Sequence, residues 1–337
     1  AMNVYEMTRR LIDIESITNN EQEVGVWLLD YLSRLAERTG GAAEAMEVEP
    51  GRPNVFAHWG EPWVMLSTHM DVVPPFFASR EDESAIYGRG ACDAKGIIAA
   101  MIAAAEELLE RGCRNFGLLF VVGEERNSAG AYAAARQPRG SRYIVNGEPT
   151  ENKLALGSKG TLRHEIVARG RMAHSAYPEL GESAIVKLLD ALERIRRVPL
   201  PTDPVLGQST LNIGTISGGR APNVIPDEAR AETMIRLVSD AEPLREAIRQ
   251  AAADSVEAIE VLSIPAIRLN SMGGLPTTVV SFTTDIPAFG GAWGEPFLIG
   301  PGSIHVAHTL DEKVAKSQLA EAVEIYRGMV ERLLVAM

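Results

Sequence analysis

Cysteine is scarce in this sequence, with only Cys92 and Cys113 among 337 residues. A small fold held together by disulfides is therefore excluded. No basic segment followed by an apolar stretch opens the chain, and the longest apolar run, residues 97–105, falls well short of the ~20 residues of a membrane-spanning helix. These absences favour a reduced, cytoplasmic protein.

Basic residues are also fewer than acidic ones. Lys and Arg number 33 against 45 Asp and Glu, which gives a net charge of -12. Nucleic acids and anionic membranes repel such a chain at long range, so we expect neither as a partner. A hydrophobic content of 46% is enough for a large core, and a length of 337 residues favours two domains over one.

Apolar runs that alternate with helical patterns indicate the fold of the first domain. Helical spacing predicts helices over 4–14, 21–38, 95–111 and 316–337, and short apolar runs predict buried strands over 63–67, 116–122, 143–145 and 297–299. This alternation is typical of an α/β protein with a mostly parallel sheet, whose strand ends carry the chemistry.

The pattern changes over residues 158–262. Strands are predicted over 161–168, 210–216 and 229–238, with helices over 183–196 and 241–252. This β-α-β-β-α order suggests a compact α+β layer with one exposed sheet face. The candidate metal ligands described below flank this segment on both sides. We therefore predict a domain inserted at 158–262 into a discontinuous domain of residues 1–157 and 263–337.

Glu124 and Glu125 are adjacent carboxylates at the end of an apolar run. Two neighbouring charges of the same sign repel each other, so a fold that keeps both near one pocket needs solvent or a cation around them. The first turn of a helix also favours acidic residues, an alternative that explains one glutamate better than two. In extended backbone, alternation would turn the two side chains in different directions.

Other residue types that bind metals stand in comparable places. His69 and Asp71 follow a predicted strand, where extended backbone points both to one side, so Asp71 can fix the tautomer of a metal-bound His69. Asp93 ends a glycine-rich loop that runs into a predicted helix. An N-cap aspartate is the alternative, although the loop has more glycine than a cap requires. Cys92 has no histidine nearby in sequence and is interpreted as a small buried residue.

Two further segments complete the pattern. Glu148 lies between Gly147 and Pro149, a loop setting that exposes a carboxylate and that is more often a simple surface turn. Near the C-terminus, the segment GPGSIHVAHTLDE offers His305 and His308. Together these carboxylates and histidines would suit a two-metal hydrolase.

These motifs resemble, in the same order and along nearly the whole chain, the M20 family of dinuclear zinc amidohydrolases. The likeness is strongest to acetylornithine deacetylases and next strongest to succinyl-diaminopimelate desuccinylases. It implies an α/β catalytic domain with an inserted α+β lid domain, a homodimer formed through the lid, and two Zn²⁺ ions for which Co²⁺ could substitute. The motifs are His69-x-Asp71, GRGACDAKG, Glu124-Glu125, Gly147-Glu148-Pro149-Thr150 and GPGSIHVAHTLDE.

The resemblance also implies the metal ligands and the base. His69 and Glu148 would bind one zinc ion, Glu125 and His308 the other, and Asp93 would bridge them. Four positive charges would then meet three carboxylates and a bridging hydroxide. One carboxylate is left over, that of Glu124, which the resemblance makes the general base.

His308 is implied in preference to His305 because the family places its ligand in an Ala-His-x-x-x-Glu context. Ala307, His308 and Glu312 match that context. The Asp93–Ala94 peptide corresponds to a bond that is cis in the family.

Four residues are implied to contact substrate. His174, in the sequence His-Ser-Ala-Tyr-Pro, resembles a lid histidine that reaches the partner's active site and steadies the oxyanion. Asn223 and Arg236 resemble lid residues that hold substrate, and Arg236 suits a carboxylate. A turn asparagine and a surface arginine are the alternatives. Gly302, in GPGSI, completes the set.

The activity expected from these features is removal of an acyl group from an N-acyl amino acid, foremost N-acetylornithine or the acetyl-lysine and acetylcitrulline analogues. A desuccinylase, a di- or aminopeptidase of the same family, and a metal-binding scaffold without catalysis are the alternatives. Three departures bear on the pocket: residues 72–87 are shorter than in the family, Ala94 replaces a larger residue, and Arg126 replaces a small polar one.

Overall fold

The computed structural model describes residues 2–336, which divide into two compact units. The first unit comprises the chain up to Leu156, Leu269–Thr278 and the chain from Thr284 onward. The second unit comprises Gly157–Arg268 and Val279–Thr283. The sequence placed the insertion at 158–262, so the observed unit runs further and includes a second short segment.

A six-stranded sheet forms the centre of the first unit, in the order β1-β2-β6-β3-β7-β19. The pairs β6/β3, β3/β7 and β7/β19 are parallel, as expected, whereas β1/β2 and β2/β6 are antiparallel. The sheet is therefore mixed. Its strands are β1 (Ala42–Glu49), β2 (Arg52–Trp59), β3 (Val64–His69), β6 (Phe116–Val121), β7 (Tyr143–Asn146) and β19 (Glu295–Leu298).

The sequence prediction missed the β1–β2 hairpin for a physical reason. Strand β1 forms the edge of the sheet, and it is mostly exposed, so its composition is polar rather than apolar. Strand β2 contains Pro53 near its start, a residue that argues against a strand in a sequence pattern. Neither strand therefore shows the apolar pattern from which a strand is predicted.

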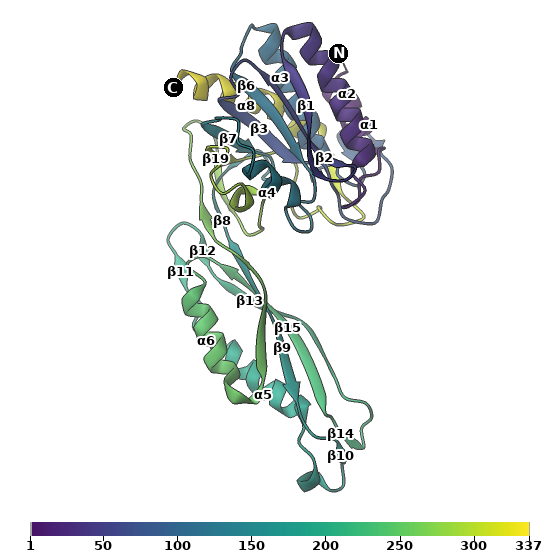
Figure 1. Ribbon diagram of the computed structural model, residues 1–337, viewed down its shortest axis with the longest axis vertical. Helices are drawn as coiled ribbons and strands as arrows, with labels where there is room; N and C mark the ends of the chain where they lie inside the picture. Colours follow the sequence, from purple (N-terminus) through teal and green to yellow (C-terminus); the bar gives the residue numbers. More distant parts are fainter. Residues whose placement is uncertain (1, 337) are drawn as a thin grey trace. The chain divides into compact units, whose positions relative to one another are not determined.

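Helices cover both faces of this sheet (Figure 1). One core joins Leu66 to Met101 and Tyr326 on the side of four helices, and a second core joins Met65 to Phe289 on the opposite side. Adjacent residues of β3 thus face different layers. The first layer holds α1 (Val4–Ile12), α2 (Gln22–Thr39), α3 (Lys95–Glu110) and α8 (Lys316–Val335), and the second α4 (Ala129–Ala135) and α7 (Ile286–Phe289).

A small sheet joins the segment after β3 to the segment before α8. Strands β4 (Arg80–Glu81), β5 (Ala85–Tyr87) and β20 (Lys313–Ala315) pair in the order β20-β5-β4. The Asp93–Ala94 peptide is cis, as the resemblance implies, and Pro74–Pro75 is also cis.

The second unit is an antiparallel sheet with helices on one face. Its long elements follow the order β-α-β-β-α-β, one strand more than the sequence predicted, because Glu257–Ile264 overlaps the expected boundary at 262. Along β15, buried and half-buried residues alternate, so one face is open as expected. The sheet order is β13-β15-β9-β16, with β9 (Gly160–Arg169), α5 (Ala184–Arg196), β13 (Thr210–Gly218), β15 (Glu228–Leu237), α6 (Glu242–Ala252) and β16 (Glu257–Ile264).

Short elements complete the chain. Two turns of 3-10 helix lie at Pro178–Leu180 and Ala253–Ser255. The remaining strands are β8 (Leu154–Ser158), β10 (Ala173–His174), β11 (Thr202–Asp203), β12 (Gly207–Gln208), β14 (Val224–Ile225), β17 (Ile267–Arg268) and β18 (Thr277–Val280). Within residues 2–336, none of the helices combines the length and the apolar composition needed to span a bilayer.

Candidate metal centre

The candidate ligands gather where the parallel strands of the first unit end. Strand β3 ends at His69, β7 ends two residues before Glu148, and the chain after β6 turns at Gly123 into the glutamate pair. In α/β sheets, functional groups collect at this carboxyl edge because the loops that leave parallel strands all begin there. The short apolar runs recognised in the sequence therefore position the site.

Asp93 lies between two histidines. Its Oδ1 is 2.9 Å from Nε2 of His69, and its Oδ2 is 3.2 Å from Nε2 of His308. Glu125 Oε1 is 3.0 Å from the same nitrogen of His308. Three groups bring one ligand atom from each residue within 4.8 Å of the others: His69, Asp93 and Glu148; His69, Glu124 and Glu125; Asp93, Glu125 and His308.

All five residues proposed as ligands are thus brought together, whereas His305 is exposed and belongs to none of these groups. Asp93 is no helix cap, because the N-cap of α3 is Ala94. Glu148 is only 4% exposed, so the expectation that its loop exposes the carboxylate was wrong. Cys92 is fully buried, and burial raises the pKa of its thiol, which agrees with an inert packing residue.

The electrostatics of this cluster are those of crowded anions. Burial, reinforced by the charge of Glu148, raises the pKa of Glu124 well above its usual range. Burial also raises the pKa of Glu148 and of Glu125. Hydrogen bonds that His308 donates to Asp93 and Glu125 raise its pKa to about 10. These directions show that, without a cation, the site favours its protonated forms.

His69 and Asp93 respond to the same crowding. Burial alone would lower the pKa of His69, but the charge of Glu124 and the hydrogen bonds to Asp71 and Asp93 raise it well above its usual value. Burial would raise the pKa of Asp93, but hydrogen bonds from both histidines lower it.

The residues present fit a pair of divalent cations. Histidine nitrogens and carboxylate oxygens are the ligands that Zn²⁺ commonly takes. Oε1 of Glu148 is buried and has no hydrogen-bond partner among the described residues, which is what a metal ligand shows when protein groups alone are considered. Asp93 directs one carboxylate oxygen toward His69 and the other toward His308. Glu148 joins the group of His69, and Glu125 joins the group of His308.

Asp71 holds the glutamate pair rather than acting on His69 alone. Its Oδ1 accepts a hydrogen bond from the backbone N–H of Glu124 at 3.0 Å, and its Oδ2 accepts one from Glu125 at 3.1 Å. Thr18 Oγ1 donates to Oδ2 at 2.7 Å. Nδ1 of His69 lies 2.9 Å from the backbone oxygen of Asp71 and 3.4 Å from its Oδ1. The histidine tautomer is therefore fixed mainly by a carbonyl group.

The glutamate pair lies in a turn, which corrects the expectation of extended backbone. Gly123 has φ +77°, and its carbonyl accepts hydrogen bonds from the N–H groups of Asn127 and Ser128. The two side chains still diverge: Glu125 meets His308 at 3.0 Å, whereas Glu124 stays 3.9 Å from His69 without a hydrogen bond. The turn, clamped by Asp71, produces what alternation was expected to produce.

Glu312 supports the loop that carries Asp93. Its buried carboxylate accepts a hydrogen bond from the N–H of Gly90 and another from Arg89 at 3.2 Å. Gly90 has φ +91°, a conformation that favours glycine. The Ala-His-x-x-x-Glu context therefore has a structural basis, because Glu312 ties the segment after His308 to the loop before Asp93.

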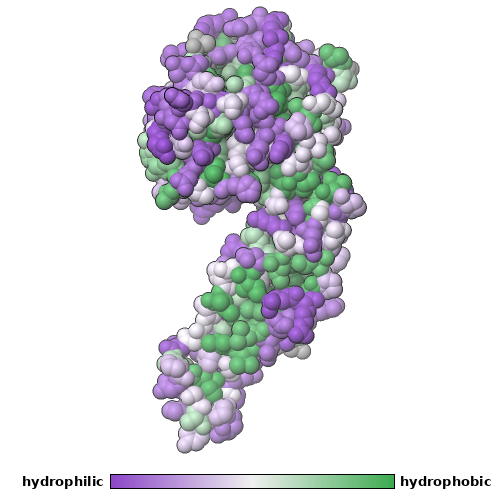
Figure 2. Space-filling model, turned by 180° about the vertical axis from the view of Figure 1, so that it is seen from behind, coloured by the Kyte–Doolittle hydropathy of each residue, from purple (hydrophilic) through white to green (hydrophobic). Residues whose placement is uncertain are grey.

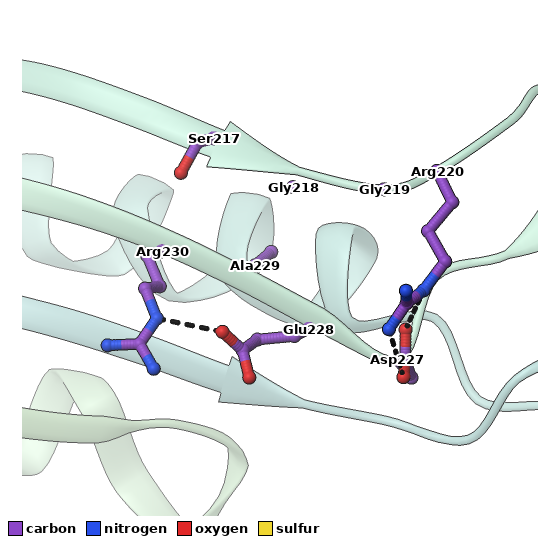
Figure 3. Close-up of a pocket in the computed structure, with 8 residues that line it drawn as sticks. All are labelled: Ser217, Gly218, Gly219, Arg220, Asp227, Glu228, Ala229 and Arg230. Carbon is purple, nitrogen blue, oxygen red and sulfur yellow. Dashed lines mark hydrogen bonds and ion pairs between the residues drawn. The ribbon is translucent and has the colours of Figure 1, made fainter.

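In the second unit, His174 and Asn223 lie together at one end of the sheet. Strands β10 and β14 pair His174 with Val224, and the N–H of Ser175 donates to the backbone oxygen of Asn223 at 3.0 Å. Both side chains are exposed. Arg220 and Asp227, joined by two hydrogen bonds of 3.2 Å, close the base of the loop that carries Asn223 (Figure 3).

Arg236 lies at the opposite end of this sheet. It pairs in register with Thr161, at the start of β9, while His174 follows the end of that strand at Arg169. The eight residue steps from Thr161 to Arg169 span roughly 26 Å. One chain therefore cannot bring Arg236 and His174 to the same small substrate.

Gly302 has a packing role. Its N–H donates to Oε1 of Gln318 at 2.7 Å, and its carbonyl accepts from the N–H of Glu151 at 2.9 Å. At φ +89° it lies against Cys92 with no room for a side chain. Both backbone groups are engaged, so the structure gives no support to the prediction that Gly302 binds substrate.

Two residues at the centre, Thr18 and Asp285, were not predicted from the sequence. Thr18, which bonds Asp71, lies 53 positions away and carries no local signal. Asp285 is buried beside the ligands, but its TTDIP context is typical of a helix start and gives no hint of a metal site.

Comparison with solved structures identifies the fold class. Aminopeptidase PepT from Bacillus cereus matches with a TM-score of 0.80 over 98% of this chain and 97% of that chain, at 18% sequence identity. The architecture of a catalytic domain with an additional lid domain is thus that of M20 peptidases.

Sequence relatives place the chain within that class. It is 38% identical over 340 residues to a peptidase M20 domain-containing protein of Schizosaccharomyces pombe, covering 97% of this chain and 84% of the relative. It is 36% identical over 372 residues to a probable carboxypeptidase of Aspergillus flavus, covering 97% and 86%. The model of Peptidase family M20/M25/M40 matches residues 65–332. The chain therefore belongs to this family, and it is a hydrolase that acts on amide bonds.

Proposed function

We propose that the protein is a metal-dependent peptidase that hydrolyses the amide bond of a small peptide or N-acyl amino acid with a free carboxylate. The observation that carries this proposal is the largely buried cluster of His69, Asp93, Glu125 and Glu148, which the exposed His308 completes, with Glu124 beside it making no hydrogen bond to a histidine. A relative named as a probable carboxypeptidase supports the peptidase alternative, whereas N-acetylornithine has no such support.

In this proposal His69 and Glu148 would hold one divalent cation, Glu125 and His308 the other, and Asp93 both. Two bound Zn²⁺ ions would polarise the amide carbonyl and lower the pKa of a water molecule. The second unit serves as a lid. The protein is expected in the cytoplasm, an expectation that two free cysteines support.

Glu124 moves the proton in this proposal. It is the member of the pair that makes no hydrogen bond to a histidine, and its N–H is clamped by Asp71, so its carboxylate is held in place and available. It takes a proton from the attacking water and returns it to the leaving amine.

Arg236 is the candidate for the substrate carboxylate. Its guanidinium is half-buried, and burial lowers its pKa. It donates to Thr161 Oγ1 at 2.8 Å, and it forms no ion pair with the side chains that the structure describes. A half-buried cation without an anion suits a ligand that supplies one.

The test is kcat/KM of the zinc-loaded protein over dipeptides, their C-terminal amides, N-acetylornithine, N-acetyl-lysine and N-succinyl-diaminopimelate. We expect dipeptides with a free carboxylate to react fastest and their amides to react poorly. Comparable rates for dipeptides and their amides would contradict recognition of a carboxylate. Faster hydrolysis of N-acetylornithine than of any dipeptide would restore the deacetylase hypothesis.

We also propose a homodimer through the second unit, in which His174 serves the partner's site. Hydrophobic residues gather on this unit (Figure 2), and its exposed large apolar side chains include Val186 and Leu189 of α5 and Ile216 of β13. A second copy would also resolve the separation of His174 from Arg236, because each could come from a different chain.

Mixing two inactive variants tests this arrangement. If His174 acts in the partner's site, a dimer of one Glu124→Gln chain and one His174→Ala chain contains one complete site. Random exchange should then restore about a quarter of wild-type activity, since half of the dimers are mixed and each has one working site. No recovery after verified exchange, or a monomer in light scattering, would contradict the proposal.

A further inference from the structure

Asp285 is a buried carboxylate that no structural role explains. It lies at the start of α7, in the first unit, and it is only 1% exposed. The N–H of Ile286 bonds to Thr284 Oγ1 at 3.2 Å, so Thr284 caps this turn and Asp285 does not. Neither carboxylate oxygen of Asp285 has a hydrogen-bond partner of normal geometry among the described residues, although the Ser128 side chain lies close enough to act on its pKa. A buried carboxylate without partners is strongly unfavourable, so its presence needs a cause.

The charges that act on Asp285 come from the metal cluster. His69, Asp71 and Glu125 act on it, and its own charge acts in turn on Glu124 and Glu148. Burial, opposed in part by Ser128, raises the pKa of Asp285 to about 7. Asp285 therefore lies beside the candidate ligands, where its charge is repelled by theirs.

Other buried polar groups near this end of the sheet also lack partners. Ser67 and Asn146 are paired in register on β3 and β7, and Ser67 Oγ and Asn146 Oδ1 have no partner among residues 2–336. By alternation they share the side of Met65 and Ile144, which pack with Phe289 of α7. Asp285 and these groups thus belong to the layer on the α7 side of the ligands.

Buried carboxylates elsewhere in this unit have protein cations. Glu21 bonds to Arg52 at 2.7 Å, and Glu312 meets Arg89 at 3.2 Å. Asp285 forms no ion pair with any described residue. The cations that the neighbouring histidines and carboxylates would hold are a source of the positive charge that the ionised form of Asp285 lacks.

We propose that Asp285 is a positioning residue of the metal centre, whose charge strengthens cation binding without contact to the cation and whose side chain the fold does not need. This inference rests on the metal centre of the proposed function. It has an unusual consequence: removal of the charge should weaken metal binding and, at the same time, stabilise the metal-free protein. A residue with a merely structural role would lose stability when changed and leave metal affinity alone.

The test uses Asp285→Asn, which keeps the shape and removes the charge. Competition with a chelator should show a Zn²⁺ affinity about 10- to 100-fold weaker than that of the unmutated chain. At pH 8, where the carboxylates tend to ionise, the metal-free variant should melt about 2–4 °C higher than the metal-free unmutated chain. The matched control is Glu21→Gln, a buried carboxylate with a protein cation. It should melt lower and bind Zn²⁺ as before.

Several outcomes would overturn the inference. Equal Zn²⁺ affinity of Asp285→Asn and the unmutated chain would do so, as would a lower melting temperature of the metal-free variant. Failure of both Asp285→Asn and Asp285→Ala to fold would show that the side chain is structural. If the unmutated chain itself bound no Zn²⁺, the proposed function would fall together with the inference, whereas equal binding by both proteins defeats the inference alone.

Discussion

The two units of the molecule treat charge in opposite ways. In the first unit, the carboxylates of Asp93, Glu124, Glu125 and Glu148 crowd into a buried cluster whose positive partners are histidines. In the second unit, acidic and basic side chains form ion pairs with one another. Examples are Arg163 with Glu232, Arg230 with Glu165 and Arg220 with Asp227.

The exceptions in each unit point to ligands of opposite sign. The surplus anions of the first unit suit cations, and Arg236, which forms no ion pair with the described side chains, suits an anion. A paired surface charge contributes little and indicates no function. A buried or half-buried charge without a partner is unfavourable, so where it persists it indicates a missing partner.

The largest expected effect comes from Glu124, the member of the glutamate pair that no histidine bonds. Glu124→Gln removes the proposed base and leaves the residues of the proposed metal site in place. We expect kcat to fall about 10²- to 10⁴-fold, with two metal ions per chain retained. Steady-state kinetics together with metal analysis decide the matter. A kcat within a few-fold of wild type would show that another group takes the proton.

Asp71→Asn should have the next largest effect, because it disturbs the clamp on both glutamates. An amide nitrogen cannot accept a hydrogen bond, so the N–H of either Glu124 or Glu125 loses its acceptor. We expect kcat or metal affinity to fall about 10- to 100-fold. Thr18→Val is the matched control, since it removes a single hydrogen bond to the same carboxylate and should cost less. Wild-type behaviour of Asp71→Asn would show that the clamp has no function.

Arg236→Gln tests the second unit. Without the guanidinium, a substrate carboxylate loses its partner, and we expect KM for dipeptides to rise roughly 10- to 100-fold with metal content unchanged. Arg163→Gln is the matched control on the same open face, because Arg163 already has Glu232 as its partner. If both variants raised KM equally, general charge rather than a specific carboxylate site would be responsible.

The strand ends that carry the candidate ligands could be predicted from the sequence. The hydrogen bonds that hold these residues in place could not. His69, Asp93, Glu125, Glu148 and His308 stand in recognisable motifs beside buried strands, so pattern and resemblance together identify them. The partners of Asp71 are backbone N–H groups more than 50 positions away, and a backbone donor leaves no trace in residue identity.

The fold shows the same division. The buried parallel strands and long helices follow from periodicity, because burial on both faces demands apolar runs. Periodicity did not predict three strands. Strands β1 and β16 are mostly exposed and need no apolar pattern, and β2 contains a proline. Asp285 was not predicted as a site residue because an aspartate before a short helix is common. Its burial distinguishes it from an ordinary residue at a helix start, and burial cannot be read from the sequence.

A final, smaller effect separates the two units by the sign of their pH dependence. In the metal-free protein, Glu124 and Glu148 have pKa values well above 4.5, Asp285 has a pKa of about 7 and His308 of about 10. The folded chain thus keeps protons that the unfolded chain releases, so the stability of the first unit should fall as pH rises from 5 to 8. Asp71, whose pKa is lowered, loses its contribution only below about pH 4, outside this window.

The second unit should respond in the opposite direction. His164 is buried on β9, and burial lowers its pKa below 6.5 despite the charge of Glu260. Here the unfolded chain binds the proton more readily, so stability is complete above pH 6.5 and declines as the pH falls toward 5. Amide hydrogen exchange at pH 5 and pH 8, corrected for intrinsic rates, reports each unit separately. Zn²⁺ should reduce the slope of the first unit alone, because Lys95 and Glu312, with pKa values of about 7, titrate outside the candidate ligands. His164→Leu should reduce the slope of the second unit alone. Equal slopes in both units would mean that the crowded anions and the lone histidine do not set local stability.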